Sequence, residues 1–168
     1  MSNNVKDEKQ TVFSKGVTSK LNWWLAKYPK DQRQSAVIPG LHLLQDENGG
    51  HLTTELMDQL AGFLEMPKVA VYEVSKFYGM YEHEAIGKHK LNICTNISCM
   101  LRGSKEIIKH IENKLDIKMG QSTADGKFTL RAVECQGACC GAPMLEVGKQ
   151  FHENLTVAKV DKLLEGLE

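Results

Sequence analysis

Apolar residues in the first half of the chain recur at the three- and four-residue spacing of a helix face, and prolines and glycines separate them into segments. The pattern predicts four helices, at about residues 17–28, 32–45, 53–64 and 67–78. We expect Pro39-Gly40 to kink the second helix, and Thr53 or Thr54 to cap the third. Residues 17–82 should therefore form a small helical bundle, preceded by a flexible arm over residues 1–16, which are polar and lack periodicity.

The fourth helix and two aromatic groups lead to specific expectations about burial. Pro67 suits the first turn of the fourth helix, whose buried face is expected to hold Val69, Val71, Val74, Phe77 and Tyr78. Aromatic residues gather at Trp23-Trp24 and along 77–81. We expect one tryptophan to be core and the other half-exposed, and the second group to lie in the core between two domains.

The second half changes to short runs of strand-like alternation. These predict strands at about residues 88–94, 128–134, 144–147 and 150–152. A helix is expected after the first strand, ending near residues 115–118, and another after Thr156, which suits an N-cap. The order strand, helix, strand, strand, strand, helix indicates a thioredoxin-like α/β domain with a four-stranded sheet over residues 83–168.

Composition narrows the class of protein. Among 168 residues, 21 Lys and Arg balance 21 Asp and Glu, which argues against a generic nucleic-acid binder and a polybasic membrane-surface protein. No apolar run approaches the ~20 residues of a membrane span, and the first residues lack the apolar core of a secretory signal. We therefore expect a cytoplasmic protein. Neither a glycine-rich dinucleotide motif nor a phosphate loop is visible, so no catalytic residue is assigned.

The five cysteines all lie in the second half, at positions 94, 99, 135, 139 and 140. An odd number excludes complete disulfide pairing, and clustered cysteines in a cytosolic chain favour metal or redox chemistry. The spacing Cys94-x4-Cys99 differs from the Cys-x-x-Cys of disulfide exchange enzymes, which makes thiol exchange the weaker interpretation.

Cys94 and Cys99 form one pair, Cys135 and Cys139 a second, and each pair follows a predicted strand. If these strands are neighbours, the two loops meet at one edge and four thiolates converge. Four thiolates suit a [2Fe–2S] cluster or a tetrahedral zinc ion, and spacing alone leaves both open. The small residues Gly137, Ala138, Gly141 and Ala142 favour the cluster, because backbone N–H groups can then approach its sulfurs. A helix N-terminus after the first loop would also favour an anionic cluster.

The segments 92–103 (NICTNISCMLRG) and 133–143 (VECQGACCGAP) resemble the signature of the 24-kilodalton [2Fe–2S] subunit of respiratory complex I, the NADH:quinone oxidoreductase. The resemblance covers about residues 17–167. It implies a helical bundle followed by a thioredoxin-like domain that carries one [2Fe–2S] cluster. It also implies four ligands, Cys94, Cys99, Cys135 and Cys139, with Cys140 as an extra thiol outside the pattern.

The same resemblance implies an electron-transfer subunit, which is part of an enzyme without oxidising NADH alone. Its cluster would exchange electrons with the FMN of a flavin- and NADH-binding partner, among other peripheral-arm subunits of complex I. The chain would then lie at the cytoplasmic face of the bacterial inner membrane through its partners, with no nucleic acid bound and no direct membrane insertion. Two alternatives remain open: the equivalent subunit of a hydrogenase or formate dehydrogenase diaphorase module, and a non-redox, zinc-stabilised interaction module.

Overall fold

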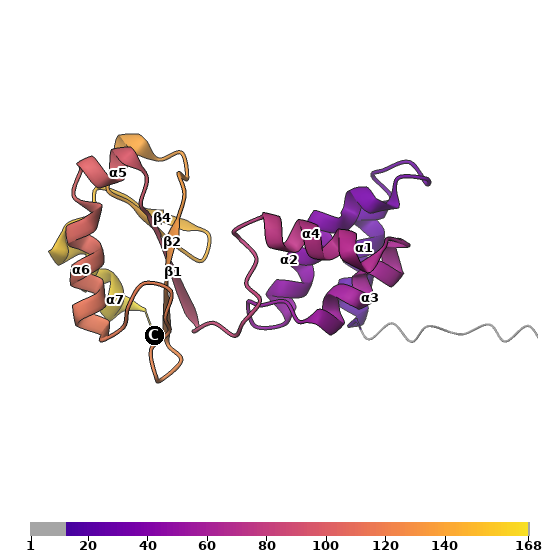
Figure 1. Ribbon diagram of the computed structural model, residues 1–168, viewed down its shortest axis with the longest axis horizontal. Helices are drawn as coiled ribbons and strands as arrows, with labels where there is room; N and C mark the ends of the chain where they lie inside the picture. Colours follow the sequence, from indigo (N-terminus) through magenta and orange to yellow (C-terminus); the bar gives the residue numbers. More distant parts are fainter. Residues whose placement is uncertain (1–12, 168) are drawn as a thin grey trace, which may run out of the picture. The chain divides into compact units, whose positions relative to one another are not determined.

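The computed structural model describes residues 13–167, and the chain divides into two compact units between Ala85 and Ile86 (Figure 1). Each unit has its own cluster of buried apolar side chains. The first unit is helical, and its elements are α1 (Lys15–Leu25), the 3-10 helix η1 (Arg33–Ala36), α2 (Val37–Glu47), α3 (Thr54–Leu64) and α4 (Lys68–Phe77).

The first helix begins earlier than the sequence predicts. The Ser14 hydroxyl accepts a hydrogen bond from the Val17 backbone N–H at 3.2 Å and caps α1. Phe13 is buried, and its ring meets that of Phe63 edge-on with centroids 6.1 Å apart. The expected flexible arm is therefore wrong for residues 13–16, because a cap and a buried ring fix them. Its remainder, residues 1–12, lies outside the described residues.

Pro39-Gly40 does not kink a long helix. Pro39 is the third residue of α2, where a backbone N–H has no partner within the helix, so proline costs little there. A Cβ on Gly40 would lie 2.8 Å from Leu60 Cδ1 and 3.2 Å from Leu21 Cδ2. Glycine at this position therefore lets α2 pack closely against α1 and α3.

Fewer residues of α4 are buried in the core than the sequence predicts. Val71 is fully buried, but Val69 and Phe77 are 60% and 80% exposed, and Tyr78 is 38% exposed. Residues 69 and 77 lie on the opposite side of the helix from residue 71, which explains their exposure. Of the aromatic group at 77–81, Tyr81 is the member that joins the helical core, and the predicted place on the buried face of α4 is wrong for Val69 and Phe77.

The cap of α3 and the exposed tryptophan agree with expectation, whereas the tryptophan expected in the core is only partly buried. Thr53, not Thr54, caps α3, because its hydroxyl accepts a hydrogen bond from the Leu56 N–H at 3.3 Å. Trp24 packs partly buried against the core, whereas Trp23 is 58% exposed. The ammonium of Lys27 lies 3.4 Å from the centroid of the Trp23 ring, so the exposed indole has a cation above it.

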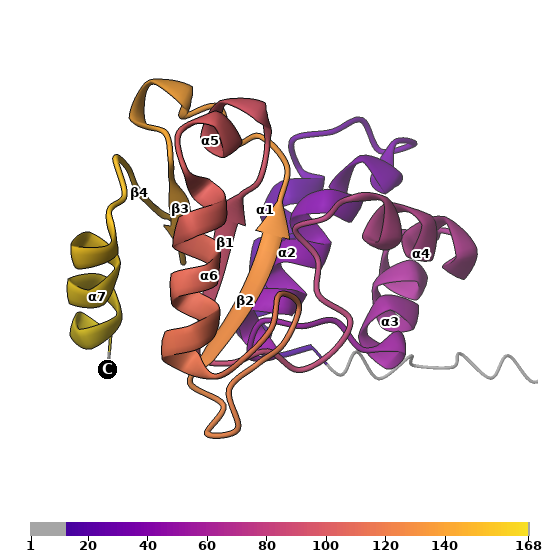
Figure 2. The same cartoon turned by 60° about the vertical axis from the view of Figure 1, so that its left-hand side comes forward.

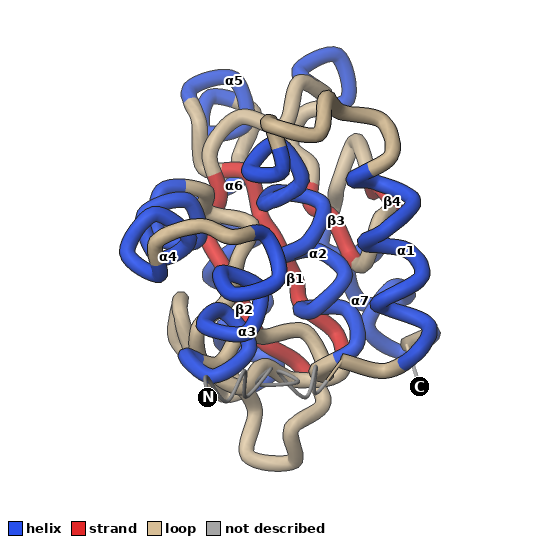
Figure 3. Tube along the Cα trace, turned by 90° about the vertical axis from the view of Figure 1, so that its right-hand side faces the viewer, coloured by secondary structure: helices blue, strands red, loops and turns tan. Residues whose placement is uncertain are grey.

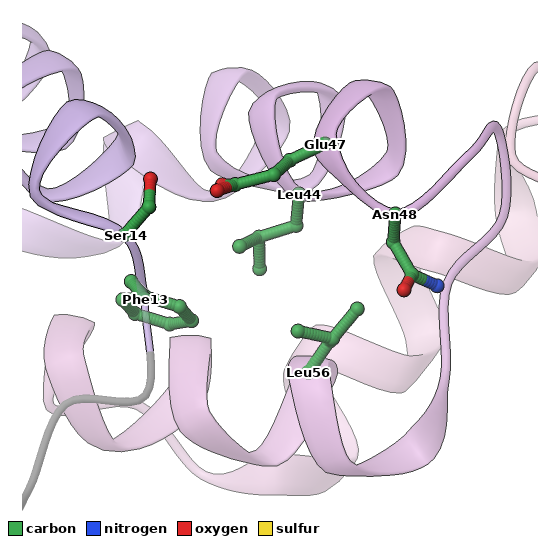
Figure 4. Close-up of a pocket in the computed structure, with 6 residues that line it drawn as sticks. All are labelled: Phe13, Ser14, Leu44, Glu47, Asn48 and Leu56. Atoms are coloured by element: carbon green, nitrogen blue, oxygen red, sulfur yellow. The ribbon is translucent and has the colours of Figure 1, made fainter.

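A pocket of about 190 Å³ lies within the helical unit (Figure 4). Three apolar and three polar residues line it: Phe13, Ser14, Leu44, Glu47, Asn48 and Leu56. Figure 4 shows the Glu47 side chain extending toward Ser14, across the apolar floor. No cysteine lines this pocket, so it is separate from the chemistry predicted for the second half.

The second unit contains a four-stranded mixed sheet with the strand order β2-β1-β3-β4. Its strands are β1 (His89–Cys94), β2 (Phe128–Val133), β3 (Leu145–Val147) and β4 (Gln150–His152). The first two pair in parallel, and the β1–β3 and β3–β4 pairs are antiparallel. The expected four-stranded sheet is confirmed.

Three helices belong to this unit: α5 (Ile97–Leu101), α6 (Ser104–Leu115) and α7 (Val157–Gly166), together with the 3-10 turn η2 (Cys139–Gly141). The single helix predicted after β1 is two helices, because Gly103 adopts φ +92° between α5 and α6. Figures 1 and 2 show α6 and α7 on the same side of the sheet, where Ile111 and Val160 are fully buried beside Leu91.

The ends of the sheet differ in character. Figure 2 shows α5 and η2 together at the end where β1 and β2 finish. The loop that precedes β2 projects at the other end, as the orange loop at the bottom of Figure 2 and the tan loop at the bottom of Figure 3 show. No helix within residues 13–167 has the length and apolar content required to cross a membrane.

An ion-pair cluster joins α6 to α7. Asp161 Oδ1 accepts a hydrogen bond from Lys114 Nζ at 2.7 Å and lies 2.7 Å from His110 Nε2. The hydrogen bond from Lys114 lowers the pKa of the Asp161 carboxyl from its ordinary value of 3.8, and the contact with His110 lowers it further. The contact between Lys114 and Asp161 therefore stabilises the folded unit at pH values above the pKa that Asp161 has in the unfolded chain. This contribution disappears as the pH falls through the lower pKa of Asp161 in the folded chain.

We expect Asp161→Asn to lower the melting temperature by a few degrees at pH 7 and by less near pH 3, because the contact with Lys114 is lost. Thermal unfolding followed by circular dichroism measures both values. Asp116→Asn is the matched control, since Asp116 ends α6 in the left-handed conformation that asparagine also tolerates. A pH-independent difference between Asp161→Asn and wild type would contradict the assignment.

Candidate metal centre

The parallel pairing of β1 and β2 brings the two cysteine loops to the same end of the sheet, where both strands finish. Cys94 is the last residue of β1 and lies opposite Val133, the last residue of β2. The loops are then joined by hydrogen bonds: Thr95 N donates to the Val133 carbonyl at 3.1 Å, and Asn96 Nδ2 donates to Glu134 Oε2 at 3.0 Å. The expectation that the two loops meet is confirmed.

The first thiol pair is buried. Cys94 and Cys99 are 3% and 1% exposed, and they pack with Ala142 and Met144 from the second loop. Asn96 Oδ1 accepts a hydrogen bond from the Ile97 N–H at 2.9 Å and so starts the short helix that carries Cys99. Because α5 has only five residues, its macrodipole is smaller than the sequence suggested.

The electrostatics link both pairs. Burial raises the pKa of the Cys99 thiol, and its hydrogen bond with Cys94 adds to the shift. The proximity of Cys94 and Cys139 acts in the same direction, so Cys99 is influenced by a cysteine from each loop. Metal ions would reverse this preference, because a coordinating thiol is deprotonated by the cation.

The second thiol pair is exposed. Cys135 Sγ and Cys139 Sγ lie 3.9 Å apart, and the Gly137 N–H donates to Cys135 Sγ at 3.4 Å. Gly137 adopts φ +80°, which supports the expectation that a small residue lets a backbone N–H approach sulfur. Gly141 has a different reason, since a Cβ there would clash with the Glu153 side chain.

Cysteines at the four predicted positions thus lie at one end of the sheet as a buried pair and an exposed pair. Within residues 13–167, no group of three or more His, Cys, Asp and Glu side chains has the arrangement of a metal-ion site. A [2Fe–2S] cluster takes two thiolates on each of its two irons, and the paired donors match that requirement. Cys140 is the neighbour of Cys139 in η2, and its side chain is exposed.

Sequence reasoning assigned no role to Asn96, Glu134 or Met144. The first two fasten the loops together, and Met144 packs against both buried thiols while its carbonyl accepts a hydrogen bond from Cys94 N at 3.3 Å. Their positions within four residues of a cysteine were the available signal. Their contacts depend on strand register, which the pattern of residues did not specify.

Known proteins that are similar to this chain agree with the family that its cysteine segments predict. Residues 21–168 match the family model described as thioredoxin-like [2Fe-2S] ferredoxin. The chain is 46% identical over 144 residues to the mitochondrial NADH dehydrogenase [ubiquinone] flavoprotein 2 of Dictyostelium discoideum, covering 86% of this chain and 58% of that protein. It is 43% identical over 141 residues to the E subunit of the NADH-quinone oxidoreductase of Rickettsia typhi, covering 84% of this chain and 83% of that protein.

A solved structure shares the fold. The crystal structure of an NAD+-reducing [NiFe]-hydrogenase in the air-oxidized state superimposes with a TM-score of 0.68 at 19% identity, covering 81% of this chain and 24% of that one. The family match spans most of the sequence, including all five cysteines. The cofactor of this family is a [2Fe–2S] cluster, which four thiolates commonly hold. This chain belongs to the thioredoxin-like [2Fe–2S] ferredoxin family.

Proposed function

We propose that this chain is an electron-transfer subunit of an NADH-oxidising complex of the NADH:quinone oxidoreductase type. In this proposal the cluster ligands are Cys94, Cys99, Cys135 and Cys139. The observation that carries it is the meeting of two thiol pairs at one end of the sheet, in a chain whose relatives include a subunit of that complex. The cluster supplies one-electron transfer when it is bound.

The protein's own residues have distinct tasks in this proposal. Cys94 and Cys99 provide donors that are shielded from water by Ala142 and Met144. Cys135 and Cys139 provide donors at the surface, where a partner can come close. The Gly137 N–H stabilises negative charge on the Cys135 sulfur by hydrogen bonding.

The proposed partner is a flavin- and NADH-binding subunit. Exposed apolar side chains on α5 stand beside the thiol site: Ile97, Met100 and Leu101 are 65%, 39% and 77% exposed. A net charge of +0 gives little long-range attraction for a diffusing partner, so an apolar contact suits a permanent subunit. Such a partner would hold the chain at the cytoplasmic face of the bacterial inner membrane.

A diaphorase module of a hydrogenase or formate dehydrogenase would use the same four cysteines in the same way. The sequence relatives that are named as subunits of NADH-quinone oxidoreductase favour the first assignment. The similarity to the NAD+-reducing hydrogenase concerns the fold.

Co-expression of the full chain with a flavin- and NADH-binding subunit of such a complex tests the proposal. We expect a stable complex that contains FMN, and about two irons and two acid-labile sulfides per copy of this chain. The chain purified alone should carry the cluster and should not oxidise NADH. Stoichiometric zinc without sulfide, or NADH oxidation by the chain alone, would overturn the proposal.

A charge on α5 should weaken the complex. Leu101→Asp places a carboxylate on the proposed contact, and we expect the dissociation constant to rise about tenfold or more, equal to at least ~1.4 kcal/mol. Val157→Asp is the matched control, because Val157 is an exposed apolar residue at the start of α7. Isothermal calorimetry with the flavoprotein measures both, and equal effects would remove α5 from the interface.

A further inference from the structure

A carboxylate lies behind the loop that carries the exposed thiol pair. Glu146 Oε2, in β3, accepts a hydrogen bond from Gln136 Nε2 at 3.0 Å and another from Asn92 Nδ2, in β1, at 3.1 Å. Gln136 follows Cys135 directly in the chain. One carboxylate oxygen therefore fastens the cysteine loop to the two central antiparallel strands of the sheet.

The Asn92 and Gln136 amides each donate an N–H hydrogen bond to this carboxylate, but their side-chain oxygens are unpaired within residues 13–167. Asn92 Oδ1 and Gln136 Oε1 are buried and have no hydrogen-bond partner among residues 13–167. Such oxygens are costly, so the hydrogen bonds on the other side must offset the loss. Hydrogen bonds to an ionised carboxylate are stronger than those between neutral groups, which makes Glu146 the anchor of the arrangement.

The position of Glu146 is set by the sheet. Asn92 and Glu146 are opposite partners in the β1–β3 ladder, so the contact between them follows from the register. Two residues before Glu146, Met144 packs against Cys94 and Cys99. The strand β3 and the residue before it thus contact the buried thiol pair through Met144, and the loop of the exposed pair through the bond from Gln136 to Glu146.

We propose that Glu146 is a positioning residue for the Cys135 loop, and that its negative charge lowers the reduction potential of the cluster. The proposal rests on the proposed function, because it requires Cys135 as a ligand. Reduction adds one electron and one negative charge to the bound cluster. The Glu146 carboxylate is bonded to Gln136, the residue after Cys135, and its negative charge opposes the added electron. Net charge and hydrogen bonding are among the factors that set the reduction potential of such a cluster.

Three variants of the full chain, in complex with its flavoprotein partner, separate charge from positioning. Glu146→Gln removes the charge and keeps the shape, whereas Gln136→Ala removes the tether and keeps the charge. Glu165→Gln is the matched control, since Glu165 contacts Lys114 between α7 and α6. A redox titration monitored by the reduced-state EPR signal gives the potential, and the rate of iron loss to a chelator reports the fixation of the loop.

Glu146→Gln should raise the ratio of reduced to oxidised clusters about fivefold at a fixed potential, equal to a shift of about +40 mV, because a tenfold change is 59 mV for one electron. Gln136→Ala should speed iron loss severalfold with a smaller change in potential. Glu146→Asp, which keeps the charge on a shorter side chain, should restore most of the potential. Glu165→Gln should change neither measurement.

An unchanged potential in Glu146→Gln, with the cluster present, would overturn the role of the charge. An equal shift in Glu165→Gln would also overturn it, as a general effect of net charge. Normal iron retention in Gln136→Ala would overturn the positioning role. These outcomes differ from failure of the proposed function, in which the wild-type chain itself contains no iron and sulfide.

Discussion

Replacing Cys139 by serine is expected to remove most of the iron and acid-labile sulfide from the chain, whereas Cys140→Ser should leave both in place. The Cys139 sulfur lies 3.9 Å from that of Cys135, as expected for two donors to one iron. Neighbouring residues of a 3-10 turn project about 120° apart, so Cys140 cannot point at the same site as Cys139. The two adjacent thiols are thus a matched pair.

Iron and sulfide analysis of anaerobically purified protein measures the loss, and the reduced-state EPR signal gives an independent readout. We expect Cys139→Ser to reduce the signal about tenfold or more, because a serine hydroxyl is a harder and weaker ligand for iron than a thiolate. Equal losses in both variants would show that the ligand assignment is wrong. Loss in Cys140→Ser alone would make Cys140 the ligand.

Gly87→Ala should destabilise the second unit by about 3 kcal/mol, near the upper end for overpacking a tight site. A Cβ at Gly87 would lie 2.8–2.9 Å from the backbone N, C and O atoms of Phe128, which cannot move without shifting β2. The Gly87 N–H also donates to the Thr129 hydroxyl at 2.6 Å in a buried position. A shifted β2 would displace the Cys135 loop, so we also expect less bound iron.

Urea unfolding followed by circular dichroism measures the change in stability. Gly166→Ala is the control in the same unit, because a Cβ there meets nothing within 4 Å and Gly166 is helical. This control should be neutral or slightly stabilising, since alanine is favoured over glycine in helices. Wild-type stability of Gly87→Ala would contradict the tight approach of Gly87 to β2.

The sequence alone determined the type and order of most elements and the spacing of the cysteine pairs. Helical spacing and strand alternation are local, so they predicted the helices of the first unit and the four strands of the second to within a few residues. The spacing of Cys94, Cys99, Cys135 and Cys139 is also a local property, and it favoured thiolate-bound metal over thiol exchange. The resemblance of the surrounding residues then favoured the cluster.

The tertiary structure decided what these local patterns leave open. The exposure of Phe77 depends on which side of α4 meets the core, and the tolerance of Pro39 depends on where α2 begins. The roles of Glu146 and Gln136 arise from a register between strands more than fifty residues apart in sequence, as the Asn92–Glu146 hydrogen bond, 54 residues apart, illustrates. Spacing predicts which thiols belong together, but only the packed sheet decides that one pair is buried and the other exposed, because burial is a property of all the elements around a residue.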